Sequence, residues 1–174
     1  MRASLWLIPA SALAAAPAQA TVYLSVEQAQ ALMFPHVALT PVSVTLTPVQ
    51  QQAIARDAGV AVPDPEVHAW RAADGGWFIL DQVYGKHSPI RYAVALDATG
   101  QVRQVEILEY LESYGGEIRL AAWRRQFVGR KHGDPVAIDR DIRNISGATL
   151  SCTHVTDGIR RVLATWAQAL APKP

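Results

Sequence analysis

Residues 67–109 read VHAWRAADGGWFILDQVYGKHSPIRYAVALDATGQVRQVEILE, and this stretch decides the fold. Val67–Ala73 and Trp77–Tyr84 are rich in the β-branched and aromatic residues that favour strands. Between them, Asp74-Gly75-Gly76 is typical of a tight hairpin turn, because glycine reaches the positive φ values that such turns need. The first half of the stretch therefore predicts two antiparallel strands.

The second half of the stretch repeats this pattern. Ile90–Asp97 and Val102–Glu109 are predicted strands, joined through Ala98-Thr99-Gly100. In Val102–Glu109, apolar and polar residues alternate imperfectly, which indicates a half-buried strand with a bulge. Together the two halves predict an antiparallel meander of about four strands.

Helical signals lie on both sides of the meander. On the N-terminal side, capping patterns predict a helix at Ser25–Met33 and a second one from Thr47-Pro48 to Gly59, followed by a linker at Val60–Glu66. On the C-terminal side, we expect a loop at Tyr110–Glu117, a helix at Ile118–Phe127, a short strand at Val136–Ile138 and a closing helix through Val155–Leu170. The predicted class is α+β, with an antiparallel sheet of about four or more strands packed with helices in a single domain.

The composition is that of a globular protein and argues against three classes of site. The chain has 16 Lys plus Arg against 15 Asp plus Glu, and a general nucleic-acid-binding surface needs a stronger basic excess. The single cysteine cannot form an internal disulfide or a paired-cysteine redox site. The five histidines show no metal-ligand spacing, so we read them as surface or core residues: His36, His68, His87, His132 and His154.

Residues 1–20 have the pattern of a secretory signal peptide. Arg2 supplies the positive start, Leu5–Leu13 is a short apolar stretch, and Ala18-Gln19-Ala20 is a small-x-small cleavage pattern. The apolar stretch is too short to span a bilayer as a helix. We therefore expect cleavage after Ala20 and export to a bacterial periplasm.

The most informative short motif is Ser146-Gly147-Ala148-Thr149, at the predicted entry to the closing helix. A helix N-terminus presents unpaired N–H groups and the positive end of the helix dipole, which together favour a phosphate group. Small residues before the helix let a ligand approach the backbone. Serine and threonine at a helix start are more often simple caps, so the residue pattern by itself leaves both interpretations open.

With Leu150 and Ser151, this motif resembles the flavinylation motif of the FMN-binding domain family, which includes the flavin-carrying subunits of sodium-pumping quinone reductase and Rnf-type complexes. The resemblance implies that Thr149 carries FMN through a phosphoester bond, made by a Mg²⁺-dependent FAD:protein FMN transferase in the same compartment. It also implies that Ser146, Gly147 and Ala148 form the turn on the phosphate side. This sequence departs from the family pattern at Arg143, where many members have Asp.

Two further features are similar to this family. The run Glu112–Glu117 resembles a loop that lies against the flavin ring, and Trp123, Phe127 and Gly129 fit its W-x3-F-x-G pattern. The resemblance covers roughly residues 77–170 and implies a small periplasmic single-domain member, with residues 67–171 as the FMN-binding domain and residues 21–66 as an N-terminal helical segment and linker. The cofactor-binding residues that it implies are Thr149, Ser146, Gly147, Ala148, Ser151, Asn144, Tyr114, Gly115, Gly116, Glu117 and Trp123.

Other residues allow competing interpretations. Cys152 and His154 lie two apart on a helix and point in nearly opposite directions, so a catalytic dyad is not expected and Cys152 reads as a buried thiol. Trp123 and Tyr114 are candidates for stacking on a flavin, although aromatic residues are more often core. The Arg and Lys side chains of residues 117–161 allow two interpretations. They either surround the cofactor with positive charge or form a solvated face that attracts an acidic partner.

The sequence therefore predicts a periplasmic electron-transfer flavoprotein rather than a complete enzyme. Its expected partners are the FMN transferase and a redox partner that is either membrane-bound or periplasmic. Nucleic acid is not an expected partner. Two alternatives stay open. One is a flavin-free ligand-binding or interaction module of the same fold, and the other is a flavin-dependent reductase with its own substrate.

Overall fold

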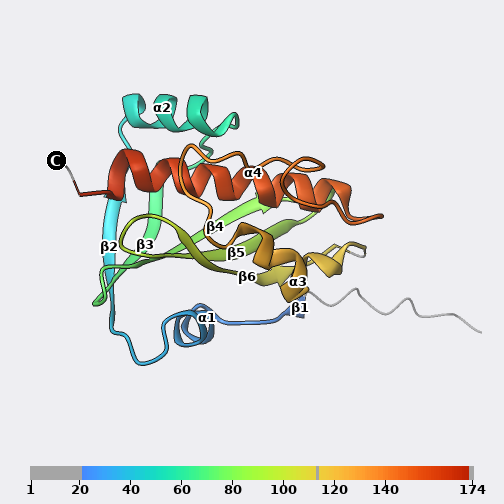
Figure 1. The fold of residues 1–174 in the computed structure, drawn as a ribbon, viewed down its shortest axis with the longest axis horizontal. Coiled ribbons are helices and arrows are strands. Elements are labelled where there is room, and N and C mark those ends of the chain that lie inside the picture. The colour runs from blue at the N-terminus through green and yellow to red at the C-terminus, as the bar shows by residue number, and fades with distance from the viewer. Residues whose placement is uncertain (1–20, 113, 173–174) are drawn as a thin grey trace, which may run out of the picture.

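The computed structural model describes residues 21–112 and 114–172, so the predicted signal peptide lies outside the described residues. Its centre is one antiparallel sheet of six strands in the order β1-β6-β5-β4-β3-β2 (Figure 1). The strands are β1 (Thr21–Val22), β2 (Leu39–Thr45), β3 (Glu66–Ala72), β4 (Trp77–Tyr84), β5 (Pro89–Leu96) and β6 (Val102–Tyr110). Antiparallel neighbours and helical layers confirm the predicted α+β class.

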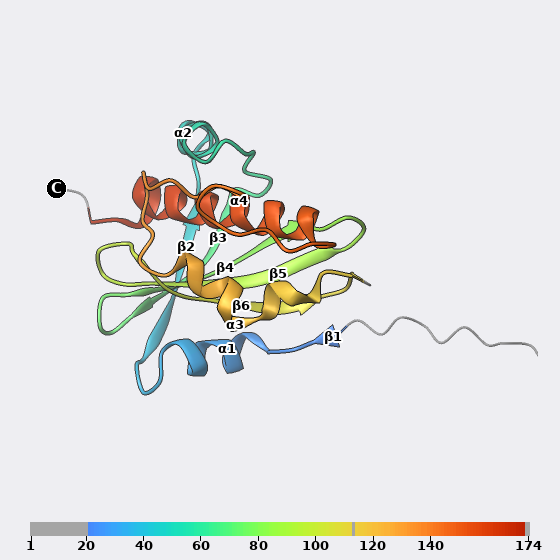
Figure 2. The same ribbon diagram turned by 45° about the vertical axis from the view of Figure 1, so that its right-hand side comes forward.

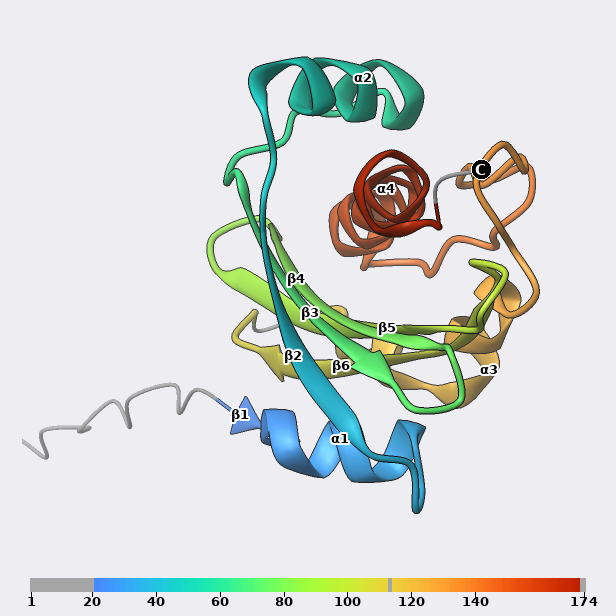
Figure 3. The same ribbon diagram turned by 90° about the vertical axis from the view of Figure 1, so that its left-hand side faces the viewer.

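Helices cover both faces of this sheet. The α-helices are α1 (Val26–Met33), α2 (Pro48–Ala58), α3 (Ala121–Arg124) and α4 (Thr149–Thr165), and 3-10 turns at Gly116–Arg119 and Arg125–Phe127 flank α3. Figure 3 looks along α4 and shows it lying across one face, with α2 above it and α1 below the opposite face. Among the described residues, no helix is both long enough and apolar enough to cross a membrane.

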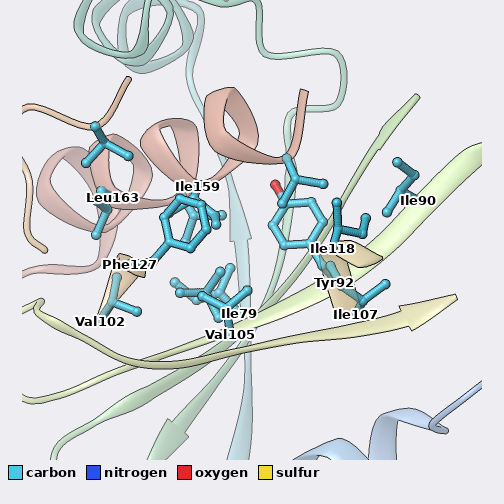
Figure 4. Packing of buried hydrophobic residues seen from close by; sticks show 14 of the residues in the cluster. Ile79, Ile90, Tyr92, Val102, Val105, Ile107, Ile118, Phe127, Ile159 and Leu163 are labelled. Atoms are coloured by element: carbon cyan, nitrogen blue, oxygen red, sulfur yellow. The ribbon is translucent and has the colours of Figure 1, made fainter. Parts of the chain in front are cut away.

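The main core lies between α4 and the sheet. Ile159 and Leu163 of α4 belong to one cluster with Tyr92 and Val94 of β5. Phe127 lies between α4 and the strands in this cluster (Figure 4). The period of two in β5 explains the two faces of the sheet, because its large residues point to α4 while the intervening alanines face α1. The small alanine side chains let α1 pack close to the second face.

The predicted helix signals are confirmed at the N-terminal side. Ser25 and Gln28 form a capping box at the start of α1, and Thr47 and Gln50 form another at α2. The C-cap of α2 is Gly59, which has a left-handed conformation with φ of 71°. Each helix therefore begins and ends where the sequence chemistry places its boundaries.

The four predicted strands are present within one or two residues of their expected bounds. The predicted bulge is in β6: Arg91 pairs with Glu109 and Tyr92 with Ile107, so Leu108 is the extra residue. Leu108 consequently faces α1 while Ile107 faces α4, and both side chains are buried. The bulge gives β6 one more apolar anchor than strict alternation would allow.

Three expectations need correction. The segment before residue 67 is not only helix and linker, because β2 forms the outer strand of the sheet and β1 pairs with the end of β6. Val136–Ile138 is not a strand, and only an isolated bridge between Ile138 and Ile142 occurs there. Ile118–Phe127 is not one helix, since the single α-helical turn of α3 lies between two 3-10 turns.

A buried ion pair joins α4 to the sheet beyond the core. The guanidinium Nη2 of Arg161 donates to the Asp81 carboxylate oxygens at 3.0 and 2.9 Å and to the Gln82 carbonyl at 2.9 Å. The Tyr92 hydroxyl donates to the same carboxylate at 2.6 Å. Gly158 makes this approach possible, since a Cβ there would lie 2.1 Å from the Tyr92 hydroxyl oxygen.

The segment 119–131 covers the edge of β6 that β1 leaves free. The Gly129 amide donates to the Val102 carbonyl, and the Val102 amide donates to the Arg130 carbonyl, each at 2.8 Å. Arg124 donates from Nη1 to the Val105 carbonyl and pairs with Glu106. The unpaired N–H and C=O groups of an exposed edge strand can pair with another chain and cause aggregation. This segment covers that edge of β6 and so prevents such pairing.

Candidate FMN site

Two segments singled out by the sequence, and one that it did not single out, meet at one end of the molecule. Here the turn between β4 and β5, the loop after β6 and the N-terminus of α4 converge (Figure 2). The Tyr110 hydroxyl links two of them, because it donates to the Tyr114 carbonyl and lies 3.0 Å from the Ser151 hydroxyl. The ring nitrogen Nδ1 of His154 contacts the Tyr84 carbonyl and links the third.

Glycine makes the closest of these contacts. Gly115 has φ of 90°, and a Cβ at this position would lie 2.6 Å from the Tyr110 hydroxyl oxygen and 2.9 Å from the Ala148 Cβ. The loop therefore packs directly on the residue before Thr149. By contrast, a Cβ at Gly116 or Gly147 would meet nothing within 4 Å, so these two backbones face open space.

The N-terminus of α4 is accessible from this open side. Ala148 is its N-cap, and no side chain of the described residues accepts a hydrogen bond from the first amides of the helix. Thr149 is exposed, and its Oγ1 accepts a hydrogen bond from Asn144 Nδ2 at 3.3 Å. The amides of the first turn of α4 can therefore donate to a phosphate group, and the exposed Thr149 hydroxyl can form an ester with it.

The chain that leads into Thr149 is held in place by hydrogen bonds to Trp123 and Gln126. Trp123 Nε1 donates to the Arg143 carbonyl at 2.8 Å, and the Arg143 amide donates to Gln126 Oε1 at 2.8 Å. Only 4% of Trp123 is exposed, and its ring packs edge-on against Phe127. The interpretation of Trp123 as a stacking platform is therefore replaced by an anchoring role in the core.

The sequence of residues 85–164 matches the family described as the FMN-binding domain. These residues belong to the FMN-binding domain family. The match includes the loop after β6, the Ser146–Thr149 motif and nearly all of α4, and it supports FMN as the cofactor of a flavoprotein. No curated protein matches the chain.

Residues of the FMN-binding domain at this end fit the phosphate part of FMN. The amides that begin α4 and the open backbone at Gly147 suit an anion, and Thr149 and Ser146 add exposed hydroxyls. Ser151 is buried and bonded to Tyr110, so it supports the site from inside rather than facing a ligand. Glu117 is exposed, at the start of the 3-10 turn after the loop.

Exposed apolar side chains lie on the three segments that meet at the Thr149 end of the molecule. Tyr114 is 83% exposed, Tyr84 is 66% exposed at the end of β4, and Leu150 is 47% exposed next to the motif. Such side chains can contact a flat aromatic ring. The sequence singled out Tyr114 and, as part of the motif, Leu150, but it did not single out Tyr84, because only the folded chain brings the β4–β5 turn to the start of α4.

Glu112 holds the β4–β5 turn against the loop. Its Oε1 accepts hydrogen bonds from the His87 and Ser88 amides at 2.6 and 2.9 Å. Burial by itself would raise the pKa of Glu112, but the amides of His87, Ser88 and Lys86 together outweigh it, and the pKa lies below its usual value. The carboxylate is thus the common acceptor that joins two of the three segments.

Replacing Glu112 by Gln should loosen this junction. A hydrogen bond to a charged acceptor is roughly twice as strong as one to a neutral acceptor, so we expect a loss of about 1 kcal/mol. Amide hydrogen exchange of His87 and Ser88 should then be roughly fivefold faster, with little change for the amides of β5. Equal exchange rates in both proteins would show that the carboxylate does not hold the turn.

The same prediction has a pH dependence. Because the folded pKa of Glu112 is lowered, its contribution is present above the unfolded pKa and is lost as the pH falls through the folded pKa. The protection factors of the His87 and Ser88 amides, that is, their exchange rates relative to the intrinsic rate at each pH, should therefore fall in acid in the wild-type protein. The Gln variant should lack this component.

A separate cavity of about 710 Å³ lies away from Thr149. It occupies the space where β3 and β4 part, under the C-terminal half of α4, and its lining includes Asp81 and Arg161. Neither Thr149 nor the loop after β6 lines it. The candidate FMN site is thus an open surface that is separate from this cavity.

Cys152 is buried directly behind the motif. Burial raises the pKa of its thiol, which keeps the neutral form at neutral pH. Its position in the core agrees with an inert packing residue. His154 lies on another side of α4, where its ring contacts the Tyr84 carbonyl.

Proposed function

We propose that the protein is an exported electron carrier that holds FMN in a phosphoester bond to Thr149. It would relay electrons between a membrane donor and a periplasmic acceptor. The observation that carries this proposal is an exposed threonine hydroxyl at the uncapped start of a long helix, inside a segment that belongs to the FMN-binding domain family. Bound FMN would supply the redox chemistry.

Attachment would be a phosphoryl-type transfer from FAD, catalysed by the FMN transferase. Thr149 Oγ1 forms a bond to the phosphorus on the FMN side, and the pyrophosphate bond breaks. AMP leaves, and the hydroxyl proton passes to a base of the transferase or to solvent. No electrons change hands in this step, so it needs no oxidant or reductant.

Residues of this chain would prepare Thr149 for that step. The Asn144 amide donates to one lone pair of Oγ1, which leaves the hydroxyl proton and the second lone pair on the open side. The first amides of α4 and the positive end of its dipole would then stabilise the phosphodiester charge. The anchored chain from Arg143 to Ala148 keeps these groups in place.

Intact-mass spectrometry tests the attachment. Protein exported from cells that express the transferase should be yellow and should weigh one FMN minus one water more than its polypeptide. Protein made without the transferase should carry no adduct. A colourless protein of polypeptide mass from transferase-containing cells would contradict the proposal.

The carrier role has its own measurement. Loaded protein should lose its flavin absorbance when mixed with membranes supplied with a quinol, and it should regain the absorbance when a periplasmic acceptor is added. Continuous turnover of a soluble substrate by the protein alone would favour the flavin-dependent reductase instead.

The second candidate is a ligand-binding module without flavin, which the cavity of about 710 Å³ favours. Its size suits a small molecule, and apolar residues such as Leu46, Val67 and Val162 line it beside the neutralised Asp81–Arg161 pair. An extract-derived small molecule in native mass spectra of flavin-free protein would support this function.

A further inference from the structure

The segment 119–131 carries positive charge without any acidic residue. Its charged residues are Arg119, Arg124, Arg125, Arg130 and Lys131. Arg124 is turned inward to Glu106, whereas the other four form no ion pair within the described part of the chain. Arg119 stacks its guanidinium over the Tyr23 ring, which leaves the charges of Arg125, Arg130 and Lys131 available to a partner.

Exposed apolar side chains lie among these bases. Leu120 is 59% exposed and Val128 is 49% exposed, while Ala121 and Ala122 are also on the surface. Trp123 and Phe127 of the same segment point inward against β6, so the four exposed residues face outward. We call the outward side the basic face, defined by Arg119, Leu120, Arg125, Val128 and Lys131.

Basic residues without an ion pair concentrate in the part of the sequence that contains this face. Of the 14 Lys and Arg in the described residues, Arg56, Arg91, Arg103, Arg124, Arg160 and Arg161 form ion pairs. Six of the remaining eight lie between residues 119 and 143: Arg119, Arg125, Arg130, Lys131, Arg140 and Arg143. The same span holds three carboxylates, so its seven bases exceed its acids by four, although the net charge of the chain is near neutral.

We propose that the basic face docks on an anionic lipid surface. A phase with negative headgroups above an apolar interior accommodates both the bases and the exposed Leu120 and Val128. An acidic protein is the less favoured partner, because protein interfaces gather aromatic anchors and both aromatic residues of this segment are buried. The lipid contact is peripheral and salt-sensitive.

Docking would also orient the candidate FMN site. Arg143 is tied to Trp123 and Gln126, so the chain that enters Thr149 is fixed to the same segment. A protein held by the basic face would keep the Thr149 end close to a membrane donor. This consequence rests on the proposed function, whereas lipid binding itself does not.

Flotation with lipid vesicles tests the proposal on flavin-free exported protein. Wild type should bind vesicles of phosphatidylcholine with phosphatidylglycerol, fail to bind pure phosphatidylcholine, and dissociate at high salt, where the Debye length falls to about 3 Å. Each cation near an anionic surface contributes roughly fivefold in affinity. Arg125→Glu with Lys131→Glu should therefore weaken binding by about 25-fold or more.

Two further variants separate the contributions. Arg56→Glu with Lys86→Glu changes the net charge equally but lies on α2 and the β4–β5 turn, so it should bind almost as wild type. Leu120→Ser with Val128→Ser should weaken binding at constant charge and leave the circular dichroism spectrum unchanged.

Three outcomes would overturn lipid docking: no binding to anionic vesicles at low salt, equal losses in both charge variants, or binding to polyglutamate but not to vesicles. The last result would assign the face to an acidic protein. Because every sample lacks flavin, failure here leaves the flavin proposal standing, and absence of an FMN adduct leaves lipid docking standing.

Discussion

Protein with Thr149→Val should leave transferase-containing cells colourless, with the mass of its polypeptide alone. Valine keeps the size and branching of threonine but has no hydroxyl, so the oxygen that would be esterified is missing. The exposed position of residue 149 means that the substitution should change the free energy of unfolding by less than about 0.5 kcal/mol. The expected effect is complete loss of the adduct from a folded protein.

Two variants make this result specific. Thr149→Ser restores a hydroxyl and should recover part of the adduct, because serine offers the same nucleophile with a less restricted side chain. Thr153→Val removes a threonine hydroxyl one turn further along α4 and should leave the adduct intact. An adduct that persists in Thr149→Val, or disappears in Thr153→Val, would place the attachment elsewhere.

The central part of the fold follows from local chemistry. Alternation and turn residues predict β3 to β6, and capping boxes at Ser25 and Thr47 mark two helix starts, because each signal depends on neighbours within a few residues. Strand β2 was not expected. Its sequence LTPVSVT contains Pro41, and only pairing with β3 on the outer edge of the sheet tolerates that residue.

The candidate site divides in the same way. The Ser146–Thr149 motif is contiguous, so the sequence predicts it, and residues 85–164 belong to the expected family. Tyr84, Tyr110 and Glu112 come from other elements, and they reach the site only through the sheet register and the close approach at Gly115. Sequence spacing carries no information about such contacts. The inward turn of Trp123 is likewise decided by packing.

The strongest expected effect on stability comes from Asp81→Asn. Only 11% of the Arg161 side chain is exposed, and the neutral amide would leave its charge buried without a counter-ion. Removing one partner from a buried pair costs about 3–5 kcal/mol, and Asp81 is 23% exposed, so we expect about 3 kcal/mol. Urea unfolding should show a lower midpoint with an unchanged slope.

The exposed pair of Asp74 and Arg103 provides the control. Their side chains are 35% and 40% exposed, so Asp74→Asn should cost no more than about 1 kcal/mol.

Adding Arg161→Met to Asp81→Asn should recover much of the loss, because the unpaired charge disappears with the arginine. The double variant could instead lose as much free energy of unfolding as Asp81→Asn and Arg161→Met lose together. The cost would then lie in the contacts of Arg161 with the Gln82 and Ala61 carbonyls rather than in the ion pair. The contacts of Arg161 lie about three turns of α4 from Thr149. The double variant therefore also tests whether the FMN site depends on them. We expect the adduct to form in every variant that keeps its fold.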